Sequence, residues 1–327
     1  MSYFCIHSNA IGMNDKWKGH LAVLAANIIF GLNVPITKAL LDRWMTPLGY
    51  MATRTLAALA IFWSLQCFLP KERVTRRDLL IIAVGGIMGF VISQFLTALS
   101  LQYTSPVYFS LIVALSPVCV MLLAALFLRE SVTRKKTAGV ALGVLGASLL
   151  IVRAWGDAAG GSDNLKGIVL ACVSILAYSV YLIVMRSVSQ RYSAVTQMKW
   201  MFLFTAIILV PLGVNEYPHQ SIYISAWEWS GVFELAFVIL FATSAGYFLM
   251  PFGMKYLRAT TVSIYMNLQP VVASVTAIFV GQDVFSWDKP LAALLVLAGA
   301  YIVSAGTRED RLNPAIESPE KISLKSK

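Results

Sequence analysis

The sequence predicts an all-α integral membrane protein with ten transmembrane helices, arranged as two inverted five-helix repeats with both termini in the cytoplasm. Three observations predict this fold: an apolar composition, the placement of positive charge between apolar segments, and a motif that occurs twice. Hydrophobic residues make up 58% of the 327 residues and charged residues 13%, against about 25% charged residues in ordinary globular domains. The mean hydropathy of +0.73 indicates that much of the surface faces lipid.

Ten segments are apolar and long enough to cross a bilayer, which takes about 20 residues per helix. They leave no stretch for a soluble domain. The predicted spans are 20–40, 47–69, 79–101, 104–128, 135–153, 165–187, 194–214, 230–253, 259–281 and 289–306.

The charges between these spans predict the orientation. If the N-terminus is cytoplasmic, the inner segments hold 19 Lys and Arg residues and the outer segments hold 5, as expected when positive charge stays inside. An even number of spans also keeps the basic C-terminal tail inside. Because the basic residues form short clusters between apolar runs, the net charge of +10 does not indicate nucleic-acid binding.

The two ends of the chain lie outside the predicted bundle. The first dozen residues have neither the basic run nor the apolar core of a signal peptide, and we expect no helix there. Met1 and Met13 are both compatible with the start of translation, and residues 1–16 are assigned to the cytoplasm. The tail 307–327 is polar and contains Pro314 and Pro319, which predicts disorder.

One motif occurs in both halves of the chain. LSPVCVMLLAALFLRE at 115–130 matches LQPVVASVTAIFVGQD at 268–283, at an offset of 153 residues. The repeats then cover 17–153 and 165–306, joined by a loop at 154–164. Each contains five spans, and because five is odd, the second repeat enters the membrane from the opposite side. Inverted repeats favour alternating access, with the substrate bound near the midplane between them.

Several stretches resemble the EamA-type carriers of the drug/metabolite transporter superfamily. FGLNVPITK at 30–38 is similar to the first-helix signature of that family, although Phe30–Gly31 stands where the family often has Trp–Gly. ALSLQYTSPVYFSLIVALSPVCVMLLAALFLRE, TAGVALGVLGASLLI and MKYLRATTVSIYMNLQPVVASVTAIFVGQD are similar to later helices of the two repeats. The resemblance covers nearly all of 19–306. It implies a central cavity lined by spans one to four and six to nine, with spans five and ten at the periphery.

We therefore expect the protein to be a secondary active transporter of a small organic solute, an amino acid or an amphipathic metabolite. The resemblance suggests export as the direction. One alternative is a carrier of nucleotide-sugar or phosphorylated metabolites, which would need several cations at midplane depth. A non-transporting membrane scaffold or membrane-embedded enzyme is the alternative of another class. We see no clustered catalytic set and therefore expect no enzyme.

Polar residues in the hydrocarbon region tend to face the bundle interior or a wet cavity. A polar residue whose repeat counterpart is also polar is the better candidate for the cavity. Four pairs meet this criterion, and three further residues share their helix faces or add an aromatic surface with a polar tip. The pairs are Asn33–Tyr181, Gln94–Tyr247, Ser110–Ser263 and Ser116–Gln269, and the further residues are Thr37, Tyr178 and Tyr265. For each residue, a hydrogen bond within or between helices remains the alternative.

Charged residues within the spans suggest a second kind of site. In one hypothesis Glu234 exchanges a proton while Arg54 or Lys38 meets an anionic group; in the other, these residues reach the interface or form structural ion pairs. Pro117 and Pro270 each remove a helix hydrogen bond and could act as hinges. Gly139 and Gly143 in span five and Gly299 in span ten are expected to pack the scaffold.

We expect no cofactor and no metal. The four cysteines, Cys5, Cys67, Cys119 and Cys172, lack metal-ligand spacing, and the chain has only three histidines. The expected partners are the small-molecule substrate and the lipid bilayer, with proton coupling and a homodimer left open. The expected location is a bacterial inner (plasma) membrane, with the chain crossing it several times.

Overall fold

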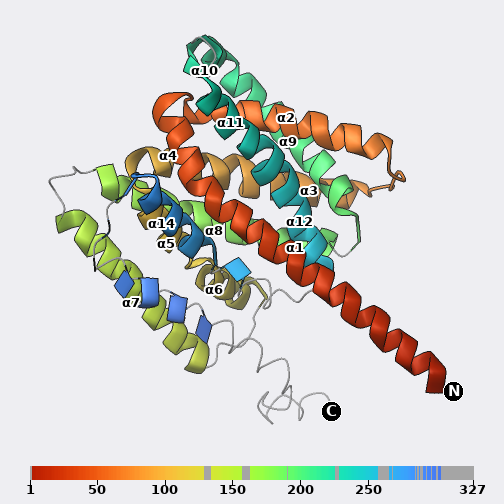
Figure 1. Cartoon of the computed structure of the whole chain (residues 1–327). Helices are drawn as coiled ribbons and strands as arrows, with labels where there is room; N and C mark the ends of the chain where they lie inside the picture. The colour runs from red at the N-terminus through yellow and green to blue at the C-terminus, as the bar shows by residue number, and fades with distance from the viewer. Residues whose placement is uncertain are drawn as a thin grey trace, which may run out of the picture.

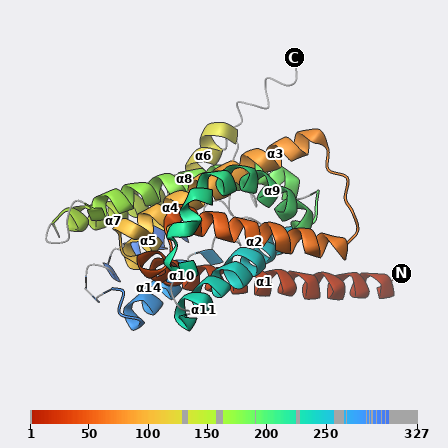
Figure 2. The ribbon, with the colours of Figure 1, turned by 90° about the horizontal axis from the view of Figure 1, so that it is seen from above.

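The computed structural model describes residues 2–128, 134–156, 163–189, 191–224, 228–256, 265–266 and 268–283, with short pieces between 285 and 302. All regular secondary structure in these residues is helical (Figures 1 and 2). The prediction of an all-helical chain is therefore confirmed for the part that is described. The predicted tail 307–327 and most of the predicted loop 154–164 lie outside it.

The helices follow one another closely along the chain. The first half contains α1 (Ser2–Arg43), α2 (Pro47–Cys67), α3 (Arg76–Gly86), the π-helix η1 (Ile87–Ile92), α4 (Ser93–Tyr103), α5 (Pro106–Val113), α6 (Ser116–Leu128) and α7 (Arg134–Gly156). The second contains α8 (Asp163–Ser189), α9 (Ala194–Gly213), the 3₁₀-helix η3 (Val214–His219), α10 (Ser221–Ile224), α11 (Trp229–Phe237), the π-helix η4 (Val238–Gly246), α12 (Tyr247–Tyr256) and α14 (Leu268–Phe279).

Seven helical stretches of the described chain are long and apolar enough to cross a membrane. They are Trp17–Arg43, Pro47–Cys67, Arg76–Tyr103, Pro106–Leu123, Asn164–Met185, Ala194–His219 and Trp229–Gly253. Shorter apolar helices at Thr137–Gly146 and Leu268–Phe279 lie within the predicted spans 135–153 and 259–281. The predicted span 289–306 falls partly outside the described residues.

Helix α1 begins earlier than the sequence predicted. We expected no helix in the first dozen residues, whereas α1 starts at Ser2 and projects beyond the bundle at its N-terminal end (Figure 1). This expectation was wrong because extending an existing helix is far easier than nucleating one. No proline interrupts the chain between Ser2 and the membrane segment that nucleates it.

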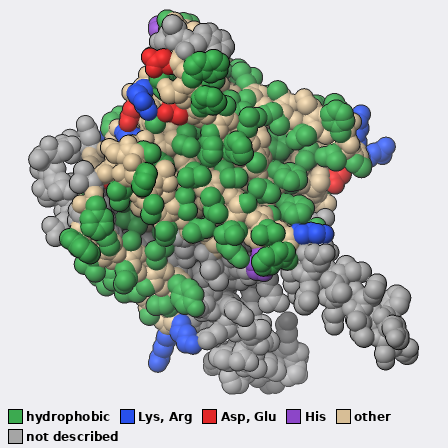
Figure 3. Space-filling view, in the orientation of Figure 1, with side chains coloured by type: hydrophobic (Ala, Val, Ile, Leu, Met, Phe, Trp, Pro, Cys, Tyr) green, Lys and Arg blue, Asp and Glu red, His purple; other side chains and the backbone are tan. Residues whose placement is uncertain are grey.

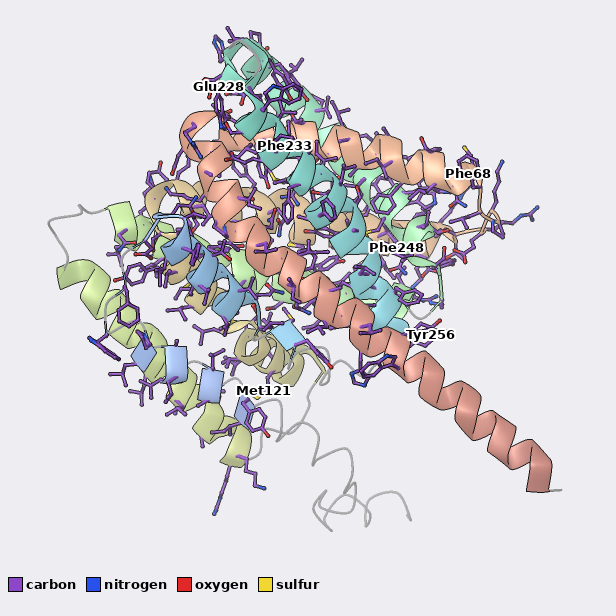
Figure 4. All side chains as sticks on the ribbon, viewed as in Figure 1. Phe68, Met121, Glu228, Phe233, Phe248 and Tyr256 are labelled. Atoms are coloured by element: carbon purple, nitrogen blue, oxygen red, sulfur yellow. The ribbon has the colours of Figure 1, made fainter. Side chains whose placement is uncertain are left out.

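The outer surface carries large apolar side chains. Green hydrophobic atoms cover most of the face in Figure 3, with charged groups near its edges. On α11–η4–α12, Phe233 is 68% exposed and Phe248 36% exposed, and both lie along the outside of the bundle (Figure 4). Exposed apolar surface of this extent is unfavourable in water and favourable against lipid.

The two halves pack against each other through several helix pairs. Helix α2 contacts α9, α4 contacts α8, and α1 contacts both α12 and α14. Each of the helices α2 and α9 begins at a hydroxyl N-cap, Thr46 or Ser193, whose side-chain oxygen accepts a backbone N–H from the first turn. The main buried core contains residues of both halves, in line with these helix contacts.

Irregular helix recurs in the predicted third and eighth spans. The π-helix η1 leads into Gln94 near the start of α4, and the π-helix η4 leads into Tyr247 at the start of α12. Such segments shift the helix register and are frequent at functional sites. They place the predicted pair Gln94 and Tyr247 just after the two distortions.

The predicted fourth span is broken between α5 and α6. Because Pro117 lacks an N–H group, it cannot donate to the carbonyl of Val113. The hydroxyl of Ser116 donates to that carbonyl instead. Pro270 lies in the first turn of α14, so both predicted hinge prolines occur just after the start of a helix.

A close helix crossing involves the glycines of the predicted fifth and tenth spans. A Cβ atom on Gly299 would lie 2.6 Å from the carbonyl oxygen of Gly139 and 2.6 Å from the nitrogen of Gly143. Only glycine fits where two backbones approach this closely. These residues therefore pack the scaffold, as the small-residue pattern predicted.

Candidate functional site

A cavity of about 100 Å³ lies between the two halves. It is lined by residues from α1, α2, α4, α5 and α6 of the first half and from α8, η4, α12 and α14 of the second. Eight residues singled out from the sequence are among them: Asn33, Arg54, Gln94, Ser110, Ser116, Tyr178, Tyr247 and Gln269.

Arg54 is the charged residue in the described wall of the cavity. Its side chain is buried, with 2% exposure. Nη1 donates to the hydroxyl oxygen of Tyr50 at 3.0 Å and to Oε1 of Gln94 at 3.3 Å, and Nε donates to Oγ1 of Thr243 at 3.1 Å. The guanidinium also faces the ring of Phe90, 5.0 Å from its centroid. These contacts tie α2 to η1, α4 and η4.

The serines and amides of the wall differ in how their polar groups are engaged. The hydroxyls of Ser110 and Ser116 donate to backbone carbonyls three residues earlier. Nε2 of Gln269 donates to Oδ1 of Asn27 at 2.6 Å, joining α14 to α1. The buried amide oxygen of Asn33 has no hydrogen-bond partner among the described residues. Asn33 is therefore the cavity amide best able to accept a bond from a ligand.

Aromatic rings separate this cavity from a smaller one. Phe30, Tyr178 and Tyr247 line both, and the second cavity of about 20 Å³ continues past Tyr181 to Met185 and Pro251. The rings of Phe30 and Tyr247 meet edge to face at 5.7 Å. The predicted residue Tyr181 therefore lines the narrower cavity.

Two predicted residues lie outside both cavity walls. Thr37 is buried, and its hydroxyl lies 3.1 Å from the hydroxyl of Tyr50. It therefore contacts the residue that holds Arg54. The hydroxyl of Tyr265 lies 3.0 Å from Nδ1 of His20 and so joins α1 to the second half. The predicted counterpart of Ser110, Ser263, lies outside the described residues.

The three charged residues grouped in the proton hypothesis do not lie together. Lys38 pairs with Asp42 at 2.9 Å, one turn later in α1. Glu234 pairs with Arg43 at 3.2 Å, and its Oε2 atom is buried without a partner in the described chain. Only Arg54 reaches the cavity.

Sequence reasoning missed part of the wall. Ser93, Thr97 and Ser174 form a hydroxyl cluster in which Ser174 Oγ lies 3.2 Å from Ser93 Oγ and 2.8 Å from Thr97 Oγ1. All three line the cavity. Ser93 lies one residue before Gln94 and Thr97 three residues after it. This closeness to a predicted cavity residue was a signal that the sequence offered. Among the described residues, no group of three His, Cys, Asp or Glu side chains could hold a metal ion.

Comparison with known proteins agrees with this architecture. The model of the EamA-like transporter family matches residues 17–152 and again 165–305. The chain belongs to the EamA-like transporter family. Both matched segments line the cavity. The family match and the apolar helices show that this EamA-like protein is a multi-pass membrane protein of a transporter family rather than of an enzyme family.

Relatives of this EamA-like protein come from archaea, bacteria and plants. An uncharacterised transporter of Archaeoglobus fulgidus is 24% identical, with 80% of this chain and 90% of the relative covered. The uncharacterised transporter YyaM of Bacillus subtilis is 24% identical over 76% and 80%. A WAT1-related protein of Arabidopsis thaliana is 23% identical over 91% and 81%. A crystal structure with 18% identity superimposes with a TM-score of 0.60 and covers 89% of this chain and 98% of its own, which supports the fold.

Proposed function

We propose that this EamA-like protein is a secondary active transporter of a small organic solute, such as an amino acid or an amphipathic metabolite. Transport proceeds by alternating access between two inverted five-helix repeats, 17–153 and 165–306, in a ten-helix bundle with cytoplasmic termini. Export from the cell across the inner membrane is the expected direction. The cavity lined by both matched segments carries this proposal.

The composition of the wall supports an organic solute. Phe30, Phe109, Tyr178 and Tyr247 present rings, while amide and hydroxyl groups lie among them. Mostly apolar walls with a few fixed polar groups are typical of sites for small molecules. A volume of about 100 Å³ is below the ~300–1,000 Å³ of pockets for drug-sized ligands and favours a small one.

The alternatives fit this wall less well. A phosphorylated metabolite or nucleotide-sugar calls for several cations, whereas the described wall contains a single one, Arg54. A scaffold has no need for a polar cavity between its halves, and a membrane-embedded enzyme would need a base and a nucleophile or metal there.

Flux through proteoliposomes tests the proposal. Purified protein would be reconstituted and screened with amino acids, nucleosides, sugars and cationic drugs, with and without a proton gradient, and in both directions. We expect saturable flux of at least one small organic solute above that of empty liposomes. Absence of such flux for every solute would contradict the transporter function.

A matched pair of variants tests the route. Ala242 is 1% exposed and lines the cavity, whereas Ala60 faces outward on α2. Ala242→Phe should fill the cavity and abolish flux, while Ala60→Phe should retain it. Equal flux in a correctly folded Ala242→Phe protein would exclude this cavity as the route.

A further inference from the structure

We infer that the cavity binds a solute with one negative charge, a carboxylate on an apolar or aromatic body, and that Arg54 holds this carboxylate. The inference rests on the proposed function, for which it names the substrate class. It starts from an imbalance of charge: Arg54 is buried, and no Asp or Glu of the described residues lies within ion-pair distance of it.

The neighbours of Arg54 solvate its charge without neutralising it. The three hydrogen-bond acceptors, on Tyr50, Gln94 and Thr243, are neutral oxygens. The acid closest in sequence to this part of η4, Glu234, is held by Arg43. Buried charges are normally paired with an opposite charge, so the cavity has a cation in need of a counter-charge.

The guanidinium has an edge left for a ligand. Nε and Nη1 are engaged by protein oxygens, whereas Nη2 donates to none of the described residues. A guanidinium has five N–H donors in a fixed plane, and its geometry matches that of a carboxylate. The Tyr50, Gln94 and Thr243 contacts fix that plane before the ligand arrives.

The rest of the wall limits the remainder of the solute. The rings of Phe30, Tyr178 and Tyr247 suit an apolar or aromatic body. The unpartnered amide oxygen of Asn33 can accept one hydrogen bond from the ligand. A single cation matches a single negative charge, so a doubly charged phosphate ester would retain an excess charge in this wall.

Binding to the detergent-purified full chain tests the inference without requiring transport. Three probes of similar shape differ in charge: phenylacetate, its neutral amide phenylacetamide, and phenyl phosphate. Their dissociation constants would be measured from the rise of Tm with concentration at constant ionic strength. We expect phenylacetate to bind at least about tenfold more tightly than either other probe, which corresponds to one charge-assisted contact.

Variants assign the charge preference to Arg54. Arg54→Gln should remove the advantage of phenylacetate over phenylacetamide, and Arg54→Lys should retain part of it. Arg43→Gln is the matched control because Arg43 lies outside the cavity wall, and it should behave as the wild type. If Arg54→Gln does not fold, mass spectrometry of phenylglyoxal-treated wild type replaces it; phenylacetate, but not phenylacetamide, should protect Arg54.

The results separate this inference from the proposed function. Equal binding of acid and amide, no binding of either, or a preference that survives in Arg54→Gln would overturn it. Tighter binding of phenyl phosphate would overturn the carboxylate class. Carboxylate-selective binding without flux would contradict only the transporter function, whereas flux of neutral solutes that is insensitive to Arg54 would contradict only this inference.

Discussion

Glu72, which follows α2 in the first half, holds Ser193, the N-cap residue of α9 in the second half. The Glu72 carboxylate accepts the backbone N–H of Ser193 at 3.0 and 3.3 Å and its hydroxyl at 3.0 Å. At the other end of the same helix pair, the hydroxyl of Thr46 donates to Oε2 of Glu216 at 2.9 Å. Since Thr46 and Ser193 are the N-caps of α2 and α9, each helix is tied at its start to the segment that follows the other helix.

The Glu72 cap predicts a pH-dependent stability. Partial burial raises the pKa of the Glu72 carboxyl, but hydrogen bonds from Thr196 and Ser193 and the nearby Lys199 charge lower it on balance below 4.5. The cap therefore stabilises the fold above about pH 4.5, and this contribution is lost as the pH falls through the lowered pKa. At neutral pH, Glu72→Gln should cost about 0.5–1 kcal/mol, measured as a lower Tm.

As the pH falls below 4.5 and through the lowered pKa of Glu72, the Tm difference between wild type and Glu72→Gln should narrow. Glu228 serves as the control, because it occupies the N-cap position of α11 without a side-chain capping hydrogen bond. Glu228→Gln removes a charge but no capping hydrogen bond, so it should lower the Tm less than Glu72→Gln does. A constant difference between wild type and Glu72→Gln across this pH range would argue against the ionised cap.

The broken span predicts a rescue between adjacent residues. Ser116→Ala removes the donor that satisfies the Val113 carbonyl and should lower stability by about 1–3 kcal/mol. Adding Pro117→Ala restores a backbone N–H for the same carbonyl and should recover most of the Tm. The double variant should also show reduced flux, because it can close the break between α5 and α6. If the second substitution restores no stability, Ser116 is not compensating for the proline.

Tyr50 and Thr37 should differ in their effect on binding. Tyr50→Phe removes an acceptor of Arg54 Nη1 and should weaken phenylacetate binding by about five- to tenfold, in line with one hydrogen bond of ~1 kcal/mol. Thr37→Val removes only the hydrogen bond to Tyr50, and it should weaken phenylacetate binding by less than about threefold. The reverse order would mean that Thr37 matters more than Tyr50 for holding Arg54 in its binding position.

The crossing at Gly299 should affect stability without affecting binding. In Gly299→Ala, the added methyl group meets backbone atoms of Gly139 and Gly143, and such overpacking typically costs about 1–3 kcal/mol. Gly143→Ala is the milder comparison, since its nearest contact is the end of the Leu115 side chain at 3.2 Å. Tm should fall more for Gly299→Ala, while phenylacetate affinity in the folded fraction stays unchanged. A loss of affinity would place the predicted spans five and ten closer to the cavity.

Glu234 should not carry the coupling proton. Its partner is Arg43, and it does not line the cavity. Glu234→Gln should therefore retain whatever pH dependence of flux the wild type shows in the proteoliposome screen. It should lose less than about 1 kcal/mol of stability. Loss of the pH dependence, with flux at a fixed pH retained, would restore Glu234 as the proton carrier.

The sequence was informative where the membrane itself imposes the constraint. Polar groups are expensive in hydrocarbon, so polar residues inside apolar spans point toward the interior. Matching them between repeats selected Asn33, Gln94, Tyr247 and Gln269, which the structure brings to one cavity. Thr37 and Tyr265, which were chosen by helix face and aromatic character, lie outside this wall, because an interior face also offers partners such as Tyr50 and His20.

The sequence by itself determined that the chain lies in a membrane, that its helices form two related sets, and which polar residues face inward, because composition and periodicity record the solvent that each helix face meets. Only the tertiary structure decided that Arg54 reaches the cavity while Glu234 and Lys38 pair elsewhere. A long side chain can extend to either interface or interior from the same backbone position. Its direction depends on the acceptors around it, and for Arg54 these are Tyr50 of its own helix α2, Gln94 of α4 and Thr243 of η4.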